Sequence, residues 1–590
     1  MSSTAQQDLA APGRPARRHV GRRGPWVGRL VCVLALTVAA PAPVAGARPV
    51  QVPTTVGDIQ QELRQRFEAA AIDPAALVVG GEALYARAAM AAFYDRRGYL
   101  PAWTAGGAVA VRTLVEALRA GDREGLVPEH YHLRALVASL DAGEAQAGDV
   151  RALAELDLLA TDALLLYAGH LVSGRVDPAT LGAEWVAVRR EAELVAWLEG
   201  VVAGGDLPGA LGTLLPSHAG YWGLRAALAR YRELAAGGGW AEIPAGEVLD
   251  PGGDDPRVPV LRSRLAATGD LAGRALVGDE EGFPAPGEAA DGGTIYDPPL
   301  VEGVRRFQRR HGLDADGRVG ERTLAALNVP AAERVRQIEL NLERWRWLPR
   351  DLGTRYLLVN IPAFELAVVD RESVVDRMRV IVGRSYRRTP VFSDQVRYIV
   401  LNPRWDVPHN LAVRDKLPLI REDSTYLSRM GIRVLSGWGA DEVEVDPAEL
   451  DWSALGRGSF PYHLRQDPGP LNALGRIKFM FPNPFNVYLH DTPERQLFAR
   501  HDRDFSSGCI RTERPLDLAV RLLAPDGITR AQLESLLETG RESTRVLGAP
   551  VPIHVLYWTA FVEAEGTVGF RRDLYQRDVA LATALARVPG

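Results

Sequence analysis

The sequence predicts a multidomain α+β protein with a helical domain, a small three-helix module and a mainly β domain. At 590 residues the chain is too long for one hydrophobic core, because domains usually hold about 150 residues. Helical spacing of Ala and Leu fills residues 59–231, whereas strand-like alternation begins near Tyr356. Hydrophobic residues at 47% and charged residues at 24% are typical of globular proteins.

The first 47 residues are typical of an export signal. Several arginines precede the apolar run 30–40, and residues 45–47 (Ala-Gly-Ala) offer a cleavage site for a signal peptidase. Because the run is shorter than the ~20 apolar residues that cross a bilayer, we expect cleavage rather than a retained membrane anchor. Arg22 and Arg23 leave both the Sec and the twin-arginine routes open.

The net charge and the cysteine content limit the partners and the chemistry that the protein can have. The formal net charge of -5 argues against a nucleic-acid partner. The chain has two cysteines, Cys32 and Cys509, and Cys32 lies in the segment that we expect to be removed. An exported protein with one thiol forms no internal disulfide, so Cys509 is either a small buried residue or a reactive thiol.

Three N-terminal regions are distinguished by composition and periodicity. Residues 57–250 are predicted to form a helical scaffold domain, in which the segment 235–253, rich in Gly and Pro, is expected to be a linker or loop. Residues 256–330 show three helical patterns, around Leu261, Val304 and Leu324. This segment is therefore predicted to be a compact three-helix module.

The β domain is predicted over residues 355–525. Alternating apolar positions indicate its strands, and they are Leu366 and Val368, then Met378 to Val382, Val396 to Val400, Ile477 to Phe481, and Val487 and Leu489. Residues 405–474 break this rhythm with Pro, Gly and a helical stretch, so we expect an inserted lid there. Residues 526–590 are expected to form a C-terminal extension whose run 553–561 returns to the sheet.

The segment from Tyr488 to Arg511 brings together the residue types needed for thiol catalysis. A cysteine with a pKa near 8.5 is only a few per cent thiolate at neutral pH, so it needs a base close by. His490 ends an alternating strand and is the candidate base for Cys509. Its imidazole has to be oriented either by Asp491 or by a nearby backbone carbonyl, and the sequence does not choose between them.

Other residues near Cys509 are candidates for support. Gly508 lets backbone amides of this turn approach a developing oxyanion, and Tyr488 offers a hydroxyl donor from the strand of His490. Arg511 can either pin the loop or bind a carboxylate. Three further histidines could in principle act as the base, and they are His409 and His463 in the expected lid and His501 in the loop before Cys509. We favour His490 because of its position at a strand end.

Two segments resemble known families. In residues 307–328, the pattern FQ-x-x-HGL followed by DG-x-VG resembles the type 1 peptidoglycan-binding domain, a three-helix bundle, which favours wall binding over a helical spacer. Residues 490–511, with a strand histidine and the loop S-x-G-C-x-R, resemble the active site of L,D-transpeptidases of the YkuD type. That likeness extends over about 355–525, and the large form with a scaffold, a binding module and a lid shares the Ser506-Ser507 pair.

The resemblance implies a function and a location. It implies that Cys509 forms a thioester with a donor tetrapeptide stem of peptidoglycan and releases D-Ala, with His490 as base. An acceptor stem then completes a 3→3 cross-link, while Ser506, Ser507, Gly508 and Arg511 shape the loop. The expected partner is peptidoglycan, other envelope proteins are possible partners, and the expected location is the periplasm.

Rival functions remain open at this point. The same residues could pass the acyl group to water, which would make the chain an L,D-carboxypeptidase or endopeptidase. A non-catalytic wall-binding scaffold is a rival of another class. We expect no metal and no cofactor, since the sequence has no HExxH and no paired-cysteine spacing.

Overall fold

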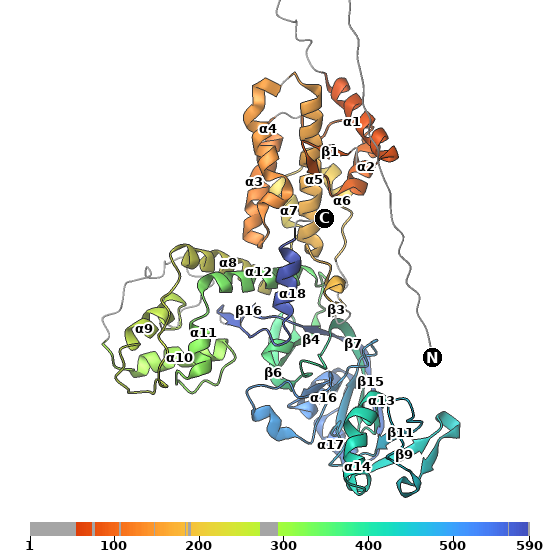
Figure 1. The fold of residues 1–590 in the computed structure, drawn as a ribbon. Coiled ribbons are helices and arrows are strands. Elements are labelled where there is room, and N and C mark those ends of the chain that lie inside the picture. The colour runs from red at the N-terminus through yellow and green to blue at the C-terminus, as the bar shows by residue number, and fades with distance from the viewer. Residues whose placement is uncertain are drawn as a thin grey trace, which may run out of the picture. The chain divides into compact units, whose positions relative to one another are not determined.

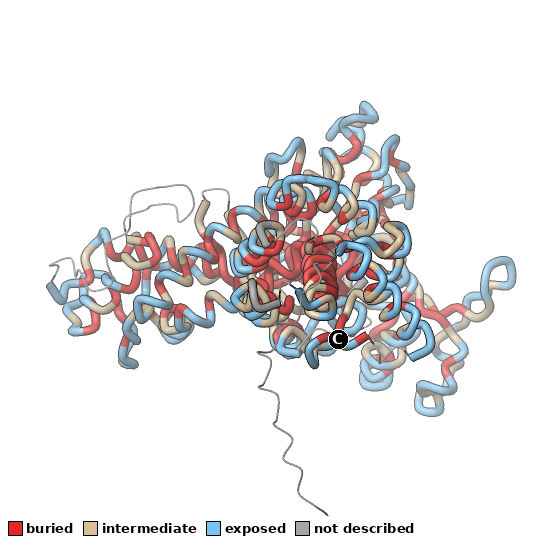
Figure 2. The backbone as a smooth tube through the Cα atoms, turned by 90° about the horizontal axis from the view of Figure 1, so that it is seen from above, coloured by how far each residue is buried: buried red, intermediate tan, exposed pale blue. Residues whose placement is uncertain are grey.

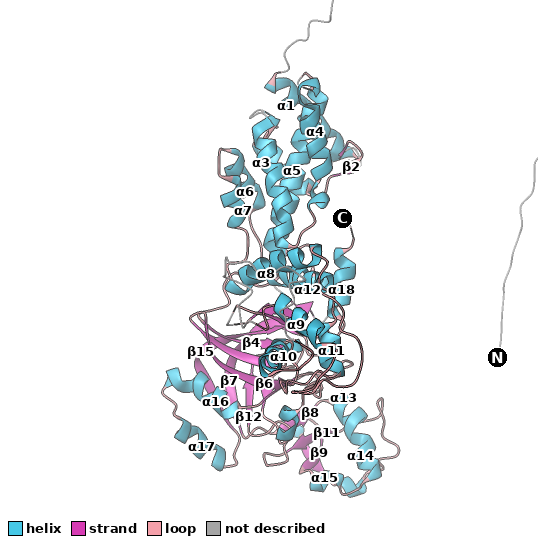
Figure 3. Cartoon of the chain, turned by 90° about the vertical axis from the view of Figure 1, so that its left-hand side faces the viewer, coloured by secondary structure: helices cyan, strands magenta, loops and turns pink. Residues whose placement is uncertain are grey.

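The computed structural model describes residues 55–73, 77–104, 108–146, 148–182, 185–186, 190–271, 293–563 and 566–587. The expected signal segment 1–47, with Cys32, lies outside the described residues. From Pro53 onward the chain belongs to one compact unit. Helical and β regions are distinct in Figures 1 and 3, and the predicted α+β multidomain fold class is confirmed.

The N-terminal region is helical, as predicted. Its helices are α1 (Val56–Ile72), α2 (Arg87–Arg96), α3 (Ala108–Arg119), α4 (Leu133–Gln146), α5 (Val150–Ser173), α6 (Leu194–Val202), α7 (Leu207–Gly212) and α8 (Ala219–Ala236), with a short hairpin of β1 (Val78–Val79) and β2 (Glu82–Ala83). Asp149 caps α5 by accepting from the Arg151 and Ala152 amides at 2.9 and 3.2 Å. Among the described residues α5 is the one helix long and apolar enough to cross a bilayer, and 78% of its most apolar window is buried.

The three-helix module contains α9 (Val258–Ala267), α10 (Pro298–Arg310) and α11 (Glu321–Leu327). Their apolar faces share a core that includes Leu261, Val304 and Phe307. The expected linker 235–253 is irregular, as predicted, but it is not free. Ile243 and Leu249 are buried in the core of the module, and the Ile243 amide donates to the Asn328 side chain at 2.9 Å.

Helix α12 (Ala331–Arg346) follows the module and had no counterpart in the sequence analysis. It packs against α8 and against strand β16 (Ala560–Val562). Although more than half of its side chains are polar, Asn341, Glu343, Arg344 and Arg346 are buried. In Figure 2 buried positions gather in the middle of the tube and exposed ones lie mainly at its outside. Buried charge requires partners, and Glu343 pairs with Arg346 within the helix while Arg344 pairs with Asp578.

The C-terminal half is built on one large sheet. Its strands are β4 (Arg355–Asn360), β5 (Glu365–Asp370), β6 (Ser373–Ile381), β7 (Val391–Leu401), β12 (Ile477–Met480), β13 (Leu489–His490), β14 (Ile510–Thr512) and β15 (Ser543–Leu556), with β3 (Trp185–Val186) from the N-terminal region at one edge. The order is β12-β13-β14-β6-β5-β4-β15-β7-β3. Because β12 also pairs with β7, the eight main strands close on themselves around an apolar core.

The C-terminal segment contributes directly to this sheet. Strand β15 lies between β4, to which it is parallel, and β7, to which it is antiparallel. Helices α16 (Pro515–Leu523), α17 (Arg530–Glu538) and α18 (Arg577–Leu585) supply buried residues to the same core. The hairpin of β16 and β17 (Val568–Phe570) follows β15.

The inserted segment 405–474 is more regular than we expected. It contains α13 (His409–Leu411), a π turn (Ala412–Lys416), α14 (Leu417–Glu422) and α15 (Tyr426–Arg429), and also β8 (Trp405–Val407), β9 (Ile432–Ser436), β10 (Val443–Val445) and β11 (His463–Gln466). These strands form a second antiparallel sheet in the order β10-β9-β11-β8. The broken alternation that suggested a lid did not reveal these strands. The segment, called the lid below, has its own core, which includes Val434 and Leu464.

Candidate active site

The candidate base His490 ends β13, and the candidate nucleophile Cys509 directly precedes β14, the parallel neighbour of β13. In the β13–β14 pair Leu489 is opposite Ile510 and His490 is opposite Arg511, and the Ile510 amide donates to the Tyr488 carbonyl at 3.1 Å. Leu489 and Ile510 are both fully buried on the core side. Because side chains alternate along a strand, His490 and Arg511 face the other side, together with Tyr488 and Cys509.

The turn before Cys509 is held by one buried hydroxyl. Ser506 Oγ donates to the Cys509 carbonyl at 2.5 Å and accepts from the Gly508 amide at 3.1 Å. Gly508 has φ +116°, a conformation that L side chains rarely adopt. Since the Gly508 amide is already bonded within the loop, Gly508 shapes the turn and its own N–H does not point to an oxyanion. Thr389 completes the frame, because its hydroxyl donates to the Gly508 carbonyl at 2.9 Å.

The orientation of His490 is set by a backbone carbonyl. Its Nδ1 lies 2.5 Å from the Asp491 carbonyl oxygen, so in the neutral ring Nδ1 carries the proton and Nε2 carries the lone pair. Burial, with a smaller contribution from the charge of Arg511, lowers the pKa of His490 to about 3, and the hydrogen bond to the Asp491 carbonyl opposes this in part. The imidazole is therefore neutral at neutral pH and is available as a base.

The carboxylate of Asp491 has a different task from the one that the sequence allowed. Its oxygens accept from the amides of Arg476 at 2.9 Å and Thr492 at 2.8 Å, and one oxygen pairs with Arg495 at 2.8 Å. These bonds fix the backbone after β13. Asp491 thus positions His490 through its main chain, and of the two options left open by the sequence the backbone carbonyl is the one observed.

The thiol of Cys509 is partly exposed and protonated at rest. Its Sγ lies 3.9 Å from the Asn486 carbonyl oxygen. Burial raises the pKa of Cys509, while hydrogen bonds from the Tyr488 backbone and side chain and the positive charges of Lys478 and Arg511 lower it in part. We expected a base close to the thiol. The structure has a neutral thiol and a neutral imidazole, so the proton has to move as the sulfur attacks.

Lys478 is a site residue that the sequence analysis missed. It lies opposite His490 in the β12–β13 pair, on the same face, and its Nζ is 3.9 Å from the centre of the Tyr488 ring. Burial lowers the pKa of Lys478, and the charge of Cys509 raises it in part. No motif marks this lysine, because only the strand register places it beside the thiol.

Tyr488 connects the thiol to the lid. It packs against both the catalytic core and the lid core, and its ring centre is 5.6 Å from that of His490. Burial raises the pKa of Tyr488 well above its usual range, the charge of Cys509 adds to this, and a hydrogen bond with Trp405 opposes it. Tyr488 is consequently a neutral hydroxyl donor next to the sulfur.

Ser507 and Arg511 make contacts of different kinds. Ser507 is exposed and accepts from Arg387 Nη1 at 3.0 Å, and Arg387 in turn pairs with Asp415 of the lid, with Nη2 at 2.7 Å from Oδ1. Arg511 pairs with Glu494 through Nη1, whereas its buried Nε atom has no partner. The pair with Glu494 holds the guanidinium of Arg511 in the strand that follows Cys509.

The three alternative histidines have other neighbours. His409 makes an edge contact with Phe460 at 6.0 Å between ring centres. His463, on β11 of the lid, is 3.2 Å from Glu442 and stacks on Trp438. His501 lies 3.8 Å from Asp314 of the three-helix module. These contacts give each ring a structural neighbour away from β13, so the geometry favours His490.

Three family models match the chain. Residues 354–553 match the L,D-transpeptidase catalytic domain, residues 256–327 match a peptidoglycan binding domain, and residues 88–228 match a scaffold domain. A Haemophilus influenzae protein with the provisional name L,D-transpeptidase is 35% identical over 242 residues, which are 41% of this chain and 48% of that protein. The match therefore spans about half of the length of this curated relative.

Solved structures give a weaker likeness. A crystal structure of an L,D-transpeptidase from Stackebrandtia nassauensis has 13% identity over 52% of this chain and 94% of that chain, with a TM-score of 0.20. A crystal structure of residues 123–326 of the Xylanimonas cellulosilytica L,D-transpeptidase has 14% identity over 53% and 99%, with a TM-score of 0.16. Scores this low carry no structural argument.

The family matches and the Cys509–His490 arrangement define a thiol-containing domain of the L,D-transpeptidase class. The chain carries a YkuD-type L,D-transpeptidase catalytic domain, joined to a scaffold domain and a peptidoglycan binding domain. The family predicted from residues 490–511 is therefore confirmed.

Proposed function

We propose that this protein is a peptidoglycan L,D-transpeptidase that forms 3→3 cross-links through a thioester on Cys509. One observation carries the proposal: Cys509 directly precedes the strand that lies parallel to and beside the strand of His490, within an L,D-transpeptidase catalytic domain. Peptidoglycan is the substrate class that the catalytic domain and the binding module have in common.

In the first half-reaction Cys509 Sγ attacks the carbonyl carbon at the L-centre of diaminopimelate in a donor tetrapeptide. His490 Nε2 takes the thiol proton as the C–S bond forms, so no free thiolate is needed. The same nitrogen then gives its proton to the leaving amine of D-Ala, and the C–N bond breaks. The products are a thioester on Cys509 and free D-Ala.

In the second half-reaction the side-chain amine of an acceptor stem attacks the thioester carbon. His490 takes a proton from this amine, the C–S bond breaks, and the thiolate is reprotonated. Tyr488 and Lys478 are suited to stabilise the sulfur when it leaves as an anion, because both lower the pKa of Cys509. Arg511 pairs with Glu494 through Nη1 and is suited to hold a stem carboxylate through its other terminal nitrogen.

Hydrolysis is the second candidate, and it uses the same residues. If water replaces the acceptor amine, the enzyme is an L,D-carboxypeptidase or endopeptidase. Incubating the purified protein with tetrapeptide muropeptides separates the two outcomes by mass spectrometry. We expect cross-linked dimers with loss of D-Ala, and tripeptide monomers alone would assign the protein to the hydrolases.

The catalytic role of Cys509 can be tested with a carbapenem, a class of inhibitor that acylates proteins of this family. We expect a covalent adduct on Cys509, no adduct in Cys509→Ala, and slower acylation in His490→Ala. An unchanged acylation rate in His490→Ala would remove His490 from the mechanism. A Cys509→Ala protein that retains every activity would favour a non-catalytic wall-binding scaffold.

We propose a periplasmic location, because residues 1–47 are typical of an export signal and the substrate is a wall polymer. Cell fractionation of the full chain, followed by N-terminal sequencing of the mature protein, tests this. A new N-terminus near Ala47 is expected, and intact residues 1–47 in a membrane fraction would indicate an anchor instead.

A further inference from the structure

A cleft with a volume of about 600 Å³ lies where the peptidoglycan binding module meets the catalytic domain. Its walls come from α11, from β6, from the loop before the nucleophile turn and from the β16–β17 hairpin. This volume is in the range of small-molecule sites, and such sites often lie at domain interfaces. Neither the catalytic residues nor the lid line the cleft.

The lining of this cleft is strongly basic. It includes seven arginines, among them Arg322, Arg500 and Arg503, but only three carboxylates, Asp314, Glu365 and Asp502. The whole chain has a net charge of -5, so this excess of positive charge runs against the average of the molecule. A cleft lined by one sign of charge concentrates ligands of the opposite sign.

One of these arginines has no carboxylate partner among the described residues. Arg503 donates to the carbonyls of Arg500 and His501 at 2.8 and 3.3 Å, and no carboxylate of the described chain pairs with it. Arg571 donates to the Arg310 carbonyl at 2.7 Å and has a long ion pair, 3.7 Å, with Glu563. The charge of Arg503 is therefore left for an anion in the cleft.

The cleft is continuous with the nucleophile loop on one side. The Arg503 carbonyl accepts from the Val382 amide at 2.9 Å, and the Val382 carbonyl accepts from the Ser506 amide at 2.9 Å. Ser506 in turn holds the Cys509 carbonyl. A ligand on Arg503 would therefore lie next to the backbone frame that presents the thiol, although not in the acylation site.

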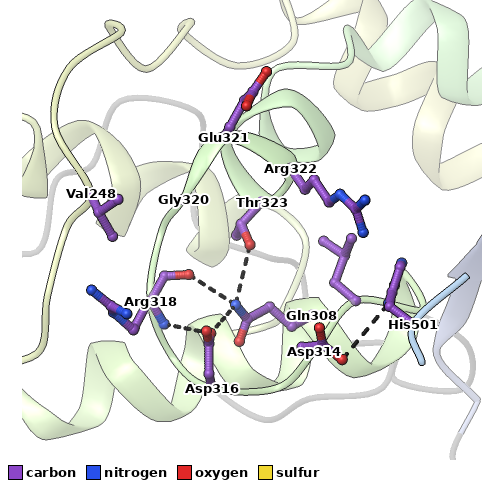
Figure 4. A pocket seen from close by; sticks show the side chains of 11 residues that line it. Val248, Gln308, Asp314, Asp316, Arg318, Gly320, Glu321, Arg322, Thr323 and His501 are labelled. Carbon is purple, nitrogen blue, oxygen red and sulfur yellow. Dashed lines mark hydrogen bonds and ion pairs between the residues drawn. The ribbon is translucent and has the colours of Figure 1, made fainter. Parts of the chain in front are cut away.

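On the other side the cleft joins the peptidoglycan binding module. Arg322, Asp314 and His501 line both the cleft and a smaller cavity of about 280 Å³. Figure 4 shows this cavity around Gln308, whose side-chain amide reaches Asp316 and Thr323, with His501 directed at Asp314. The two hollows therefore share part of their walls.

We propose that this arginine cleft binds the carboxylates of a second peptidoglycan stem peptide, outside the acylation site. The proposal rests on the proposed function, because that function supplies the polymer to both domains that form the cleft. Stem peptides carry several carboxylates, and the planar guanidinium fork matches a carboxylate in two-point contact. The cleft would hold a strand near the thiol and thereby favour polymeric over small substrates.

The test uses the full chain with Cys509→Ala, so that binding is measured without turnover. The probe is soluble, uncross-linked peptidoglycan strands with tetrapeptide stems, and the readout is the dissociation constant at two salt concentrations. We expect Arg322→Glu with Arg500→Glu to weaken binding by about tenfold and to reduce the salt dependence. Both residues are exposed, so these variants should fold.

Matched controls separate a loss of binding at the cleft from the effect of changing the net charge of the protein. Arg96 and Arg151 are exposed at 55% and 77% and lie in the scaffold domain, so Arg96→Glu with Arg151→Glu should leave binding unchanged. Strands with amidated stem carboxylates should bind the parent protein about tenfold more weakly. The proposal would be overturned if the cleft variant bound strands as tightly as the parent protein, or if the control variant lost as much affinity as the cleft variant. It would also be overturned if amidated strands bound the parent protein as tightly as unmodified strands. Stronger competition by polyphosphate than by polyglutamate would also overturn it.

A failure of the proposed function gives a different result. The cleft variant with Cys509 intact should still be acylated by a carbapenem at the parent rate, because the cleft that Arg322 and Arg500 line contains none of the catalytic residues. If the parent protein is not acylated and makes no dimers, the proposed function fails, whatever the binding data show. If it is acylated but charge reversal in the cleft does not change strand binding, only the cleft assignment fails.

Discussion

The reactivity of Cys509 depends on three groups that oppose the effect of burial on the pKa of its thiol. Burial raises the pKa of the thiol, whereas Tyr488, Lys478 and Arg511 lower it. At neutral pH the group is therefore a thiol, and the thiolate fraction rises through the alkaline range. A neutral His490 at the same face takes the proton during attack rather than before it.

This balance predicts the pH dependence of thiol alkylation. We expect the rate of iodoacetamide modification of Cys509 to rise through pH 9 without a plateau in the neutral range, since the thiolate is the reactive form. Lys478→Met should slow modification at pH 8 by about tenfold, the effect of one pKa unit. Lys478→Arg keeps the charge and serves as the control. An identical pH profile for Lys478→Met would show that this lysine does not act on the sulfur.

The paired serines of the nucleophile loop allow a matched comparison. Ser506 is 3% exposed and bonds to both Gly508 and Cys509, whereas Ser507 is exposed and bonds only to Arg387. Ser506→Ala leaves a buried amide and carbonyl without partners, which costs about 1–3 kcal/mol. We expect a lower midpoint of thermal unfolding and slower carbapenem acylation, with a smaller effect on both from Ser507→Ala. Equal effects of the two substitutions would contradict the role assigned to Ser506.

At the residue scale the sequence predicted the site residues that are close together in the chain. It missed those that only strand pairing brings to the site. The short spacing between His490 and Cys509 and the loop S-x-G-C-x-R mark a thiol site in any sequence of this type. Lys478 joins the site only through its antiparallel register with His490, which no local pattern reveals. The choice between the carboxylate and the carbonyl of Asp491 likewise depends on a backbone conformation.

At the scale of elements, one ion pair ties the lid to the nucleophile loop. Arg387 bonds both to Asp415 in the π turn of the lid and to Ser507. Asp415→Asn removes the charge partner and should weaken this tether by about 1 kcal/mol, since the pair is partly exposed. We expect faster hydrogen exchange in residues 412–416. Asp423→Asn breaks a lid pair with Arg429 that does not reach the loop, so exchange at 412–416 should not change in that control.

The hairpin of β1 and β2 is held to α5 by a buried histidine. His132 Nε2 lies 2.8 Å from Asp162, and Nδ1 pairs with Glu82. Burial opposes a charge on this ring, but the hydrogen bonds and charges of Asp162 and Glu82 outweigh it, and the pKa of His132 is raised. The stability from this pair is fully present below about pH 6.5, the unfolded value, and is lost as the pH rises through the folded pKa.

The resulting prediction concerns stability against pH. The parent protein should lose unfolding free energy between pH 6.5 and the raised pKa of His132, and His132→Gln should flatten this part of the curve in urea titrations. The control is His130→Gln. Burial lowers the pKa of His130, so this ring is neutral in both states above about pH 7 and contributes no slope there. A slope that persists in His132→Gln would assign it to other groups.

Two parts of the chain, the four lid strands and α12, escaped the sequence analysis for physical reasons. Strands β8 to β11 of the lid are three to five residues long, too short to show a convincing alternation between the turns that separate them. Helix α12 has a polar sequence, yet Glu343 and Arg346 are buried in it. Their burial depends on partners from distant segments, which local periodicity does not identify.

For the whole molecule, α12 is the element where the helical region and the C-terminal half meet. Arg346 Nη2 pairs with Glu343 at 2.9 Å, and both side chains are 1% exposed. Arg346 also donates to the Glu124 carbonyl at 2.9 Å, while Glu343 accepts from the Val176 amide at 2.9 Å. A buried pair of this kind contributes little net stability when intact, but either member alone is an uncompensated buried charge.

A double-mutant cycle separates these two effects. We expect Arg346→Met to destabilise the protein by about 3–5 kcal/mol, because Glu343 is left buried without its partner. Glu343→Leu with Arg346→Met removes both charges and should recover a large part of this loss, although the Glu124 carbonyl and the Val176 amide then lack partners. Urea unfolding followed by tryptophan fluorescence measures the free energy of unfolding of both variants. Breaking the surface pair of Arg530 and Asp517 is the control and should cost under about 1 kcal/mol. If the double substitution were as damaging as the sum of the single ones, the contacts to Glu124 and Val176, and not the ion pair, would hold α12 in place.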